Sequence, residues 1–439
     1  MSENSATKSD EQNSSLDLLE QARQLLERKD LVGCFLLSKE HWLNNPDDVQ
    51  AVEILSEVMR RNGKKELYKN LKTLCCSKDE MNSNAQSLFE AGYQFIEERE
   101  PELAAMLLRR CVTLVPDQPM VRYELGFALM QLRQFAEATQ HFEFLIQSED
   151  DFDTRLNLTV CYSLTRDIKR AKELLCELEK KAGNTEEKKE LQLRKCVVKR
   201  LEKYEQHHQL HFRDWVYALY GSVLLSDTTP KDLEGKPRSS ATDYNAVATT
   251  LLLLRGLLQE MAIEFDVIEY YSPLSRPLAE AFARLLDLSA EAYKGPDRQE
   301  RALLMMAWAS DIIGPHKTFV AQTPRRSLFA YGLTTLAQLP VTPDIIGCLA
   351  VECSMPWAQD LDNVEDKRDE KSVVHPMNLI QQQATEAILE RASALESNTE
   401  IIRQLEVLCS FYHPRREMIV LSNCQSFPER PEYTAEIPC

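Results

Sequence analysis

Small and large apolar residues recur along the first half of the chain at a spacing of 34 residues. Four pairs of residues show it: Gly92 and Gly126, Ala104 and Ala138, Leu108 and Phe142, and Cys111 and Leu145. A period of this length is typical of stacked helix-turn-helix units. The pattern predicts three such units over 85–118, 119–151 and 152–185. Two further units, with poorer agreement, are expected over 15–48 and 49–82.

This pattern resembles the tetratricopeptide repeat, and the resemblance covers residues 15–185. It implies that the paired helices approach each other closely at the small residues, while large residues fill the space between them. Stacked units of this kind bury a continuous core and leave a concave groove. In the repeat family, the first helix of each unit builds most of that groove. The resemblance therefore implies a surface that holds a peptide or a partner helix.

The offsets of the repeat place six residues in the groove: Phe89, Tyr93, Tyr123, Phe127, Met130 and Asn157. Aromatic and methionine side chains are good anchors for an inserted peptide. The alternative is that they pack against the C-terminal domain or another repeat. The clamp with which some family members grip a terminal carboxylate is not expected. Phe89, Tyr93 and Glu124 stand where that clamp needs Lys, Asn and Asn, so a chaperone-tail adaptor is not expected.

The hydrophobic pattern changes after the repeats. Residues 186–210 are rich in Lys and Arg and are expected to form a basic linker or capping helix, although such a run can also dock an acidic partner. From 211 to 425, short apolar runs alternate with helical patterns. Strands are predicted over 215–225, 265–271, 302–309, 345–353 and 418–422. Helices are predicted over 245–261, 275–288, 326–339, 378–394 and 399–412, with an acidic break over 359–372.

This alternation predicts an α/β domain with a mostly parallel sheet. The expected fold class is therefore an α solenoid followed by an α/β domain. Ligands of parallel sheets bind at the carboxyl ends of the strands. Ser272, Ser275 and Arg276 follow one predicted strand and enter a helix, whose free amides favour anions. The two serines can equally be ordinary helix caps.

The layout around this candidate anion site resembles a phosphoribosyltransferase-like or Rossmann-like domain in degenerate form. The resemblance implies binding of a phosphorylated small molecule or a nucleotide. The sequence departs from that pattern, because the later strand ends in the single acid Asp311 and no glycine-rich hydroxyl loop follows. The departure puts pyrophosphate and magnesium binding in doubt.

No motif with a strong catalytic signal occurs in the chain. It has no nucleophile elbow, phosphate-binding Walker loop, dinucleotide fingerprint or zinc-protease motif. His207 and His211 could share a helix face, but no further ligand completes a metal site. We therefore predict no catalytic residue, no metal and no cofactor, and an enzyme is the less favoured reading.

Composition and charge limit the classes of partner that are expected. The chain has 439 residues, of which only 12 are glycine, and a formal net charge of −17. Such an acidic surface repels nucleic acid and anionic membranes. Residues 1–14 and 426–439 are expected to be loose tails. Since no signal peptide is apparent at the N-terminus and the apolar run 251–258 is too short to span a bilayer, a cytoplasmic protein is expected.

Two hypotheses from different classes follow. The first is a protein-protein interaction scaffold or adaptor that binds a peptide or partner helix in the groove of the repeats. The alternative is binding of a phosphorylated small molecule or nucleotide, with or without a degenerate transferase activity, by the α/β domain. Oligomeric state, pathway and the identity of the partner have no signature in the sequence.

Overall fold

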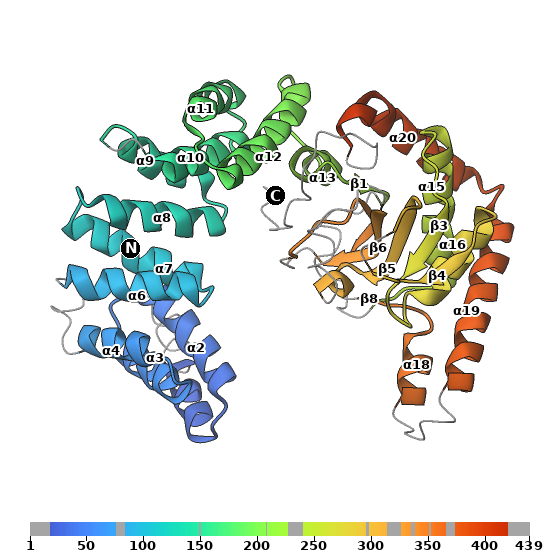
Figure 1. Cartoon of the computed structure of the whole chain (residues 1–439). Coiled ribbons are helices and arrows are strands. Elements are labelled where there is room, and N and C mark those ends of the chain that lie inside the picture. Colours follow the sequence, from blue (N-terminus) through green and yellow to red (C-terminus); the bar gives the residue numbers. More distant parts are fainter. Residues whose placement is uncertain are drawn as a thin grey trace, which may run out of the picture. The chain divides into compact units, whose positions relative to one another are not determined.

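The computed structural model describes residues 18–75, 84–148, 151–207, 209–226, 240–295, 298–313, 326–334, 339–350, 353–365 and 374–419. The chain divides into two compact units, Met1–Lys181 and Ala182–Cys439. The first is helical and the second contains a parallel sheet (Figure 1). This confirms the predicted fold class of helical repeats followed by an α/β domain. The expected tails over 1–14 and 426–439 lie outside the described residues.

The first unit consists of five consecutive helix pairs. They are residues 18–27 with α2 (Leu31–Asn44), α3 (Val49–Arg61) with α4 (Lys65–Leu74), α6 (Ala85–Glu97) with α7 (Pro101–Leu114), α8 (Pro119–Gln131) with α9 (Phe135–Leu145), and α10 (Phe152–Leu164) with α11 (Ile168–Lys181). Successive pairs stack, with α4 on α6, α7 on α8 and α9 on α10. Side-chain caps begin several of these helices, such as Asn84 on Ser87 N and Asp151 on Thr154 N.

The turn inside each pair carries one residue in the left-handed region of the backbone, two positions before the second helix. These residues are Lys29, Gly63, Arg99, Arg133 and Arg166, with φ between 60° and 77°. The left-handed conformation ends a helix cheaply only at glycine. Four of the five turns use Lys or Arg instead, which is one reason why a chain with so many turns has so few glycines.

Close approach within the pairs depends on the two glycines that mark the repeat. A Cβ atom added at Gly92 would lie 2.8 Å from Leu108 Cγ on the paired helix. A Cβ atom added at Gly126 would lie 2.8 Å from Phe142 Cζ. Leu108 and Phe142 are fully buried. The large residue of the second helix therefore fills the space that the glycine of the first helix leaves open.

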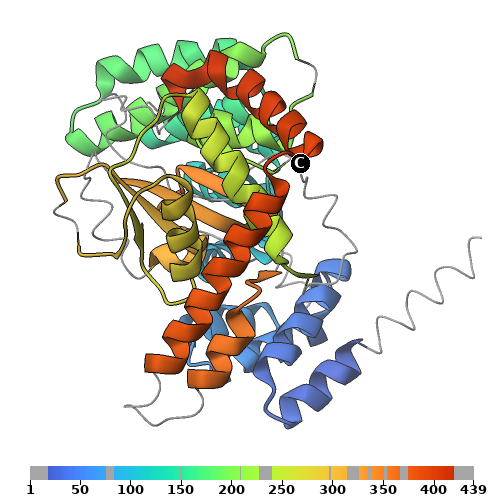
Figure 2. The same cartoon turned by 90° about the vertical axis from the view of Figure 1, so that its right-hand side faces the viewer.

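The second unit is built around a sheet of six parallel strands in the order β1-β7-β6-β5-β3-β4. The strands are β1 (Val223–Leu224), β3 (Val267–Tyr270), β4 (Ala290–Ala292), β5 (Ala302–Trp308), β6 (Arg326–Thr334) and β7 (Ile345–Ala350). A two-stranded parallel sheet pairs β2 (Ser240–Ala241) with β8 (Cys353–Ser354). Figure 2 shows the helices α15 (Tyr244–Glu260), α16 (Arg276–Leu285) and α19 (Val374–Leu395) across one face of the larger sheet.

Other helices of this unit are α12 (Thr185–Leu201), α13 (Phe212–Tyr220), α18 (Ala358–Glu365) and α20 (Thr399–Tyr412), with short 3-10 turns η1 (Glu202–Tyr204), η2 (Ala309–Ile313) and η3 (His413–Met418). The basic run becomes α12, which packs on α13. Its Arg200 is buried and donates to the carbonyl oxygen of Cys196, while Arg194 pairs with Glu190.

Two predicted elements of the second unit are wrong. The strand expected over 215–225 is mostly the helix α13. This helix begins where Asp214 accepts the backbone N–H of His211 at 2.8 Å, and it ends at the left-handed Gly221. Only the last residues of the predicted strand form β1. The helix expected over 326–339 is the strand β6, in the interior of the sheet. A strand buried on both faces is apolar throughout, so it lacks the alternation that would separate it from a buried helix.

Smaller differences concern the ends of this unit. The acidic break expected over 359–372 begins with the helix α18, and its remainder from 366 lies outside the described residues. A strand is expected over 418–422. Met418 is instead the last residue of η3, and residues 420–422 are not described. The edge strand β4 had no prediction, since three residues are too few for a pattern.

We predict that Gly126→Ala destabilises the first unit although alanine favours helices. The better helix propensity is worth about 1 kcal/mol, whereas forcing a methyl group into a packed core costs about 1–3 kcal/mol. Urea unfolding of the full chain is followed by far-UV circular dichroism. The first unit of the variant should unfold at a lower urea concentration than that of the wild type. Gly183→Ala is the control, because its added Cβ would meet its nearest neighbour at an ordinary 3.8 Å. An unchanged Gly126→Ala curve would contradict the packing account.

Candidate functional site

Three successive first helices, α6, α8 and α10, direct one side of each helix away from the core. We call this surface the first-helix face and define it by Phe89, Glu90, Tyr93 and Glu97 of α6, Met120, Tyr123, Glu124 and Phe127 of α8, and Asn157 of α10. On α6 and on α8 the residues recur at spacings of three and four, so each set lies on one side of its helix. Residues such as Leu88, Phe95, Leu125 and Leu129, on the other side, are buried.

Contacts between side chains order this face and connect α8 to α10. The Asn157 amide of α10 donates to the Tyr123 hydroxyl of α8 at 3.2 Å. Phe89 and Tyr93 of α6 stack with their ring centroids 6.4 Å apart. The Tyr123 ring packs edge-on against Phe142 of α9, with centroids 6.0 Å apart. Burial raises the pKa of Tyr123, so its hydroxyl is neutral near pH 7 and can accept the bond from Asn157.

The predicted groove residues differ in how much surface they offer. Tyr93 is 43% exposed, and Phe89, Tyr123, Phe127 and Asn157 are half-buried. Met130 is only 7% exposed and belongs to the core. The structure therefore gathers five of the six residues on one accessible face and places the sixth beneath it.

Sequence reasoning missed Met120 and Glu97 as members of this face, and it named Glu124 only as a departure from the carboxylate clamp. Met120, in the first turn of α8, is 64% exposed. Its spacing from Tyr123, Glu124 and Phe127 was the signal that could have found it. Glu97 and Glu124 lie on neighbouring helices, and Glu124 is half-buried. Burial raises the pKa of Glu124, and the charge of Glu97 raises it further.

The candidate anion residues of the second unit lie where the sheet changes its direction of winding. From β3 the chain continues to the edge strand β4, whereas from β5 it continues to β6 and β7 on the other side. The reversal falls between the neighbours β3 and β5. Ser272 follows β3, and Asp311 follows β5 in η2. Open parallel sheets bind ligands at such a point.

Ser272 and Ser275 direct their hydroxyl groups at Asp311. Both Oγ atoms lie 3.2 Å from Asp311 Oδ2 and 2.8 Å from each other. Ser275 is fully buried, and its Oγ also accepts the backbone N–H of Ala307 in β5 at 2.9 Å. Burial raises the pKa of the Asp311 carboxyl, while the two hydroxyl donors lower it. The hydroxyl groups of Ser272 and Ser275 are thus already bonded to a carboxylate of the chain itself.

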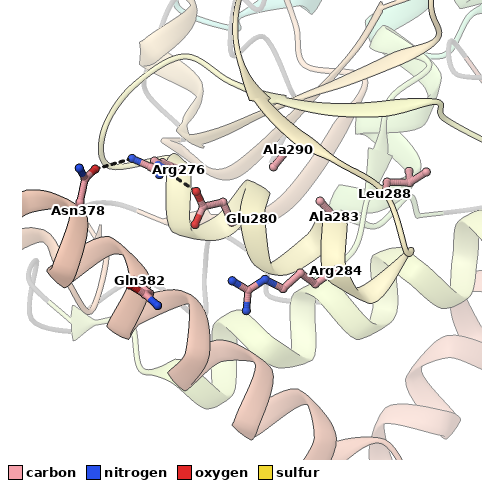
Figure 3. Close-up of a pocket in the computed structure, with 8 residues that line it drawn as sticks. All are labelled: Arg276, Glu280, Ala283, Arg284, Leu288, Ala290, Asn378 and Gln382. Atoms are coloured by element: carbon pink, nitrogen blue, oxygen red, sulfur yellow. Dashed lines mark hydrogen bonds and ion pairs between the residues drawn. The ribbon is translucent and has the colours of Figure 1, made fainter.

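Arg276 does not join the two serines. Its guanidinium pairs with Glu280 at 2.7 Å and donates to Asn378 at 2.8 Å and Gln381 at 3.0 Å. It lies at one end of a surface groove of about 400 Å³ between α16 and α19 (Figure 3). The groove is lined by Arg276, Glu280, Ala283, Arg284, Leu288, Ala290, Asn378 and Gln382. Both arginines of this lining are paired, Arg276 with Glu280 and Arg284 with Glu386.

The described residues contain neither a metal site nor a membrane-spanning helix. No group of three or more His, Cys, Asp or Glu side chains there could hold a metal ion. None of the helices described is long and apolar enough to cross a membrane.

Comparisons with known proteins found similar folds only among solved structures. No protein-family model and no curated protein matches the chain. PilF of Pseudomonas aeruginosa is 16% identical, with a TM-score of 0.27, over 44% of this chain and 87% of its own. YrrB, described as a tetratricopeptide-repeat protein with an unusual peptide-binding site, is 18% identical, with a TM-score of 0.24, over 39% and 89%.

A third structure, Naa15/Naa10 bound to HypK, is 13% identical, with a TM-score of 0.28, over 94% of this chain and 55% of its own. The fold of residues 18–181 is evident from the structure itself. Its stacked helix pairs, with glycines 34 residues apart at the close contacts, agree with the tetratricopeptide-like repeat fold that the sequence predicts.

We predict that Ser275→Ala destabilises the second unit by about 1–3 kcal/mol, since it leaves buried partners without a hydrogen bond. The loss should be larger at pH 7 than at pH 4. The fold raises the pKa of Asp311, so the ionised form opposes folding and this cost disappears as the pH falls through that pKa. Removing a donor raises the pKa further. Urea unfolding at both pH values tests this, with the exposed Ser289→Ala as the control. Equal losses at both pH values would exclude the Asp311 linkage.

Proposed function

We propose that the first unit is a protein-protein interaction module that binds a peptide or a helix of a partner along the first-helix face. The observation that carries this proposal is the exposure of large apolar side chains there, with Met120 at 64% and Tyr93 at 43%. Contiguous apolar surface rimmed by polar groups is typical of interaction sites. The aromatic side chains supply large, rigid contact area, and the flexible thioether of Met120 can adapt its shape to a partner.

The rigidity of the face supports the same function. The Tyr123 ring is fixed by Phe142 and its hydroxyl by Asn157, while Phe127 is half-buried beside the fully buried Ala128 and Leu129. Side chains that are already ordered lose little freedom when a partner binds, so more of the contact energy appears as affinity. The second unit would then be a structural or partner-binding companion of this module.

Binding of a phosphorylated small molecule by the second unit is the other candidate, and these contacts do not favour it. Asp311 takes the hydroxyl donors of Ser272 and Ser275, and a phosphate there would stand against a carboxylate. Arg276, the cation expected to attract the phosphate, is directed at Glu280 and α19.

The proposal predicts that Tyr93→Ala combined with Met120→Ala removes the partners of the chain without unfolding it. Both side chains are substantially exposed, so the free protein should keep its thermal stability to within about 1 kcal/mol. Loss of two interface anchors should reduce partner recovery more than tenfold. The measurement is quantitative mass spectrometry of proteins that copurify with the tagged full chain from a lysate of its source.

The control for this experiment is Leu114→Ala, which removes a 39% exposed apolar side chain from the end of α7. Because Leu114 lies on a second helix, this variant should retain every partner. Retention of all partners by the double variant as well would show that the first-helix face is not their binding surface.

A further inference from the structure

The charges around the apolar side chains of the first-helix face have one sign. Glu90 and Glu97 flank Tyr93 on α6, and Glu124 lies between Tyr123 and Phe127 on α8. Within the described residues, none of these three glutamates takes part in an ion pair. Glu90 accepts only the Gln86 amide, at 2.6 Å. A partner that covers the apolar side chains must therefore also cover unneutralised carboxylates.

Several carboxylates elsewhere in the same unit are paired with Arg or Lys side chains. Glu57 is held by Arg60 and Arg61, Glu137 by Arg109, and Glu143 by Arg170. Lys64 pairs with Glu98, the residue directly after Glu97. Some other acids of the unit, such as Glu53 and Glu66, also have no ion pair among the described residues, but they are exposed. Glu90 and Glu124 of the first-helix face differ, because they are half-buried without a cation.

The ionised form of Glu124 is energetically unfavourable in the free protein. It is half-buried on α8, and the charge of Glu97 on α6 is close enough to raise its pKa together with burial. A cation placed between the two carboxylates would remove the repulsion and supply the charge partner that burial demands. A neutral or acidic segment would add further desolvation without compensation.

We propose that the first-helix face binds a partner segment in which an arginine or lysine stands beside aliphatic or aromatic side chains, with its cation between Glu97 and Glu124. This inference rests on the function proposed above and names the chemistry of the partner. Arginine suits the position best, since its planar guanidinium can bond two carboxylates and stack on a ring such as Tyr93 or Phe127. The net charge of −17 would also attract a basic segment from a distance.

The test is a selection of random 16-residue peptides displayed on phage against the full chain, followed by fluorescence anisotropy with synthetic copies. We expect the selected peptides to be enriched in Arg or Lys next to Leu, Phe or Trp. Glu124→Gln should weaken their Kd about tenfold, as expected for one charge-assisted hydrogen bond. Glu97→Gln should act in the same direction. Glu173→Gln, an equal loss of charge at an exposed position of α11, should leave the Kd unchanged.

The outcomes separate this inference from the proposed function. Peptides that depend on Tyr93 and Met120 but are neutral or acidic, or that ignore Glu97→Gln and Glu124→Gln, would overturn the inference and keep the function. Absence of any selected peptide that depends on Tyr93 and Met120 would overturn both. The stability of the free variant excludes a folding artefact, because Glu124→Gln removes a repulsion and should unfold no earlier than the wild type.

Discussion

The close approach of two helices inside each pair is the constraint on which the first unit depends. Gly92 and Gly126 leave space that Leu108 and Phe142 fill to within contact distance, so no larger residue is tolerated there without a shift. This contact fixes how each first helix is rotated about its axis. Once one side of α6 or α8 is committed to its paired helix, the opposite side is committed to the surface. The line of Tyr93, Tyr123 and Phe127 is therefore a consequence of packing.

Much of this was predictable because the constraint repeats. A glycine, an alanine and a large apolar residue at fixed offsets cannot recur 34 residues apart by helix propensity alone, so the period revealed the pairs and their outward faces. The second unit has no repeat to average over. The sequence predicts a helix in place of β6 because a strand buried on both faces, as residues 328–331 are, has no alternation of apolar and polar residues. It predicts a strand in place of α13 because the aromatic run hides the cap at Asp214 and the end at Gly221.

The details of the sites depend on contacts across long stretches of chain. The sequence placed Ser272 and Ser275 at a strand end, but it gave no sign that Asp311, 39 residues beyond Ser272, would turn back to accept their hydroxyl groups. In the same way, an offset places Glu124 on the outward side of α8 but does not say that it is half-buried or that it feels the charge of Glu97. Met130 shows the converse, since an outward offset ended in the core.

A protein keeps a half-buried charge beside a like charge at its surface when the benefit arises elsewhere, and interaction faces are where such local costs are expected. The most direct test is a double-mutant cycle that combines Glu124→Gln with replacement of the peptide arginine by citrulline, its neutral analogue, measured as Kd by isothermal titration calorimetry. The account predicts a coupling energy of about 1 kcal/mol or more, well above the scatter for independent sites. Strictly additive losses would show that the cation does not meet Glu124 and would contradict the account.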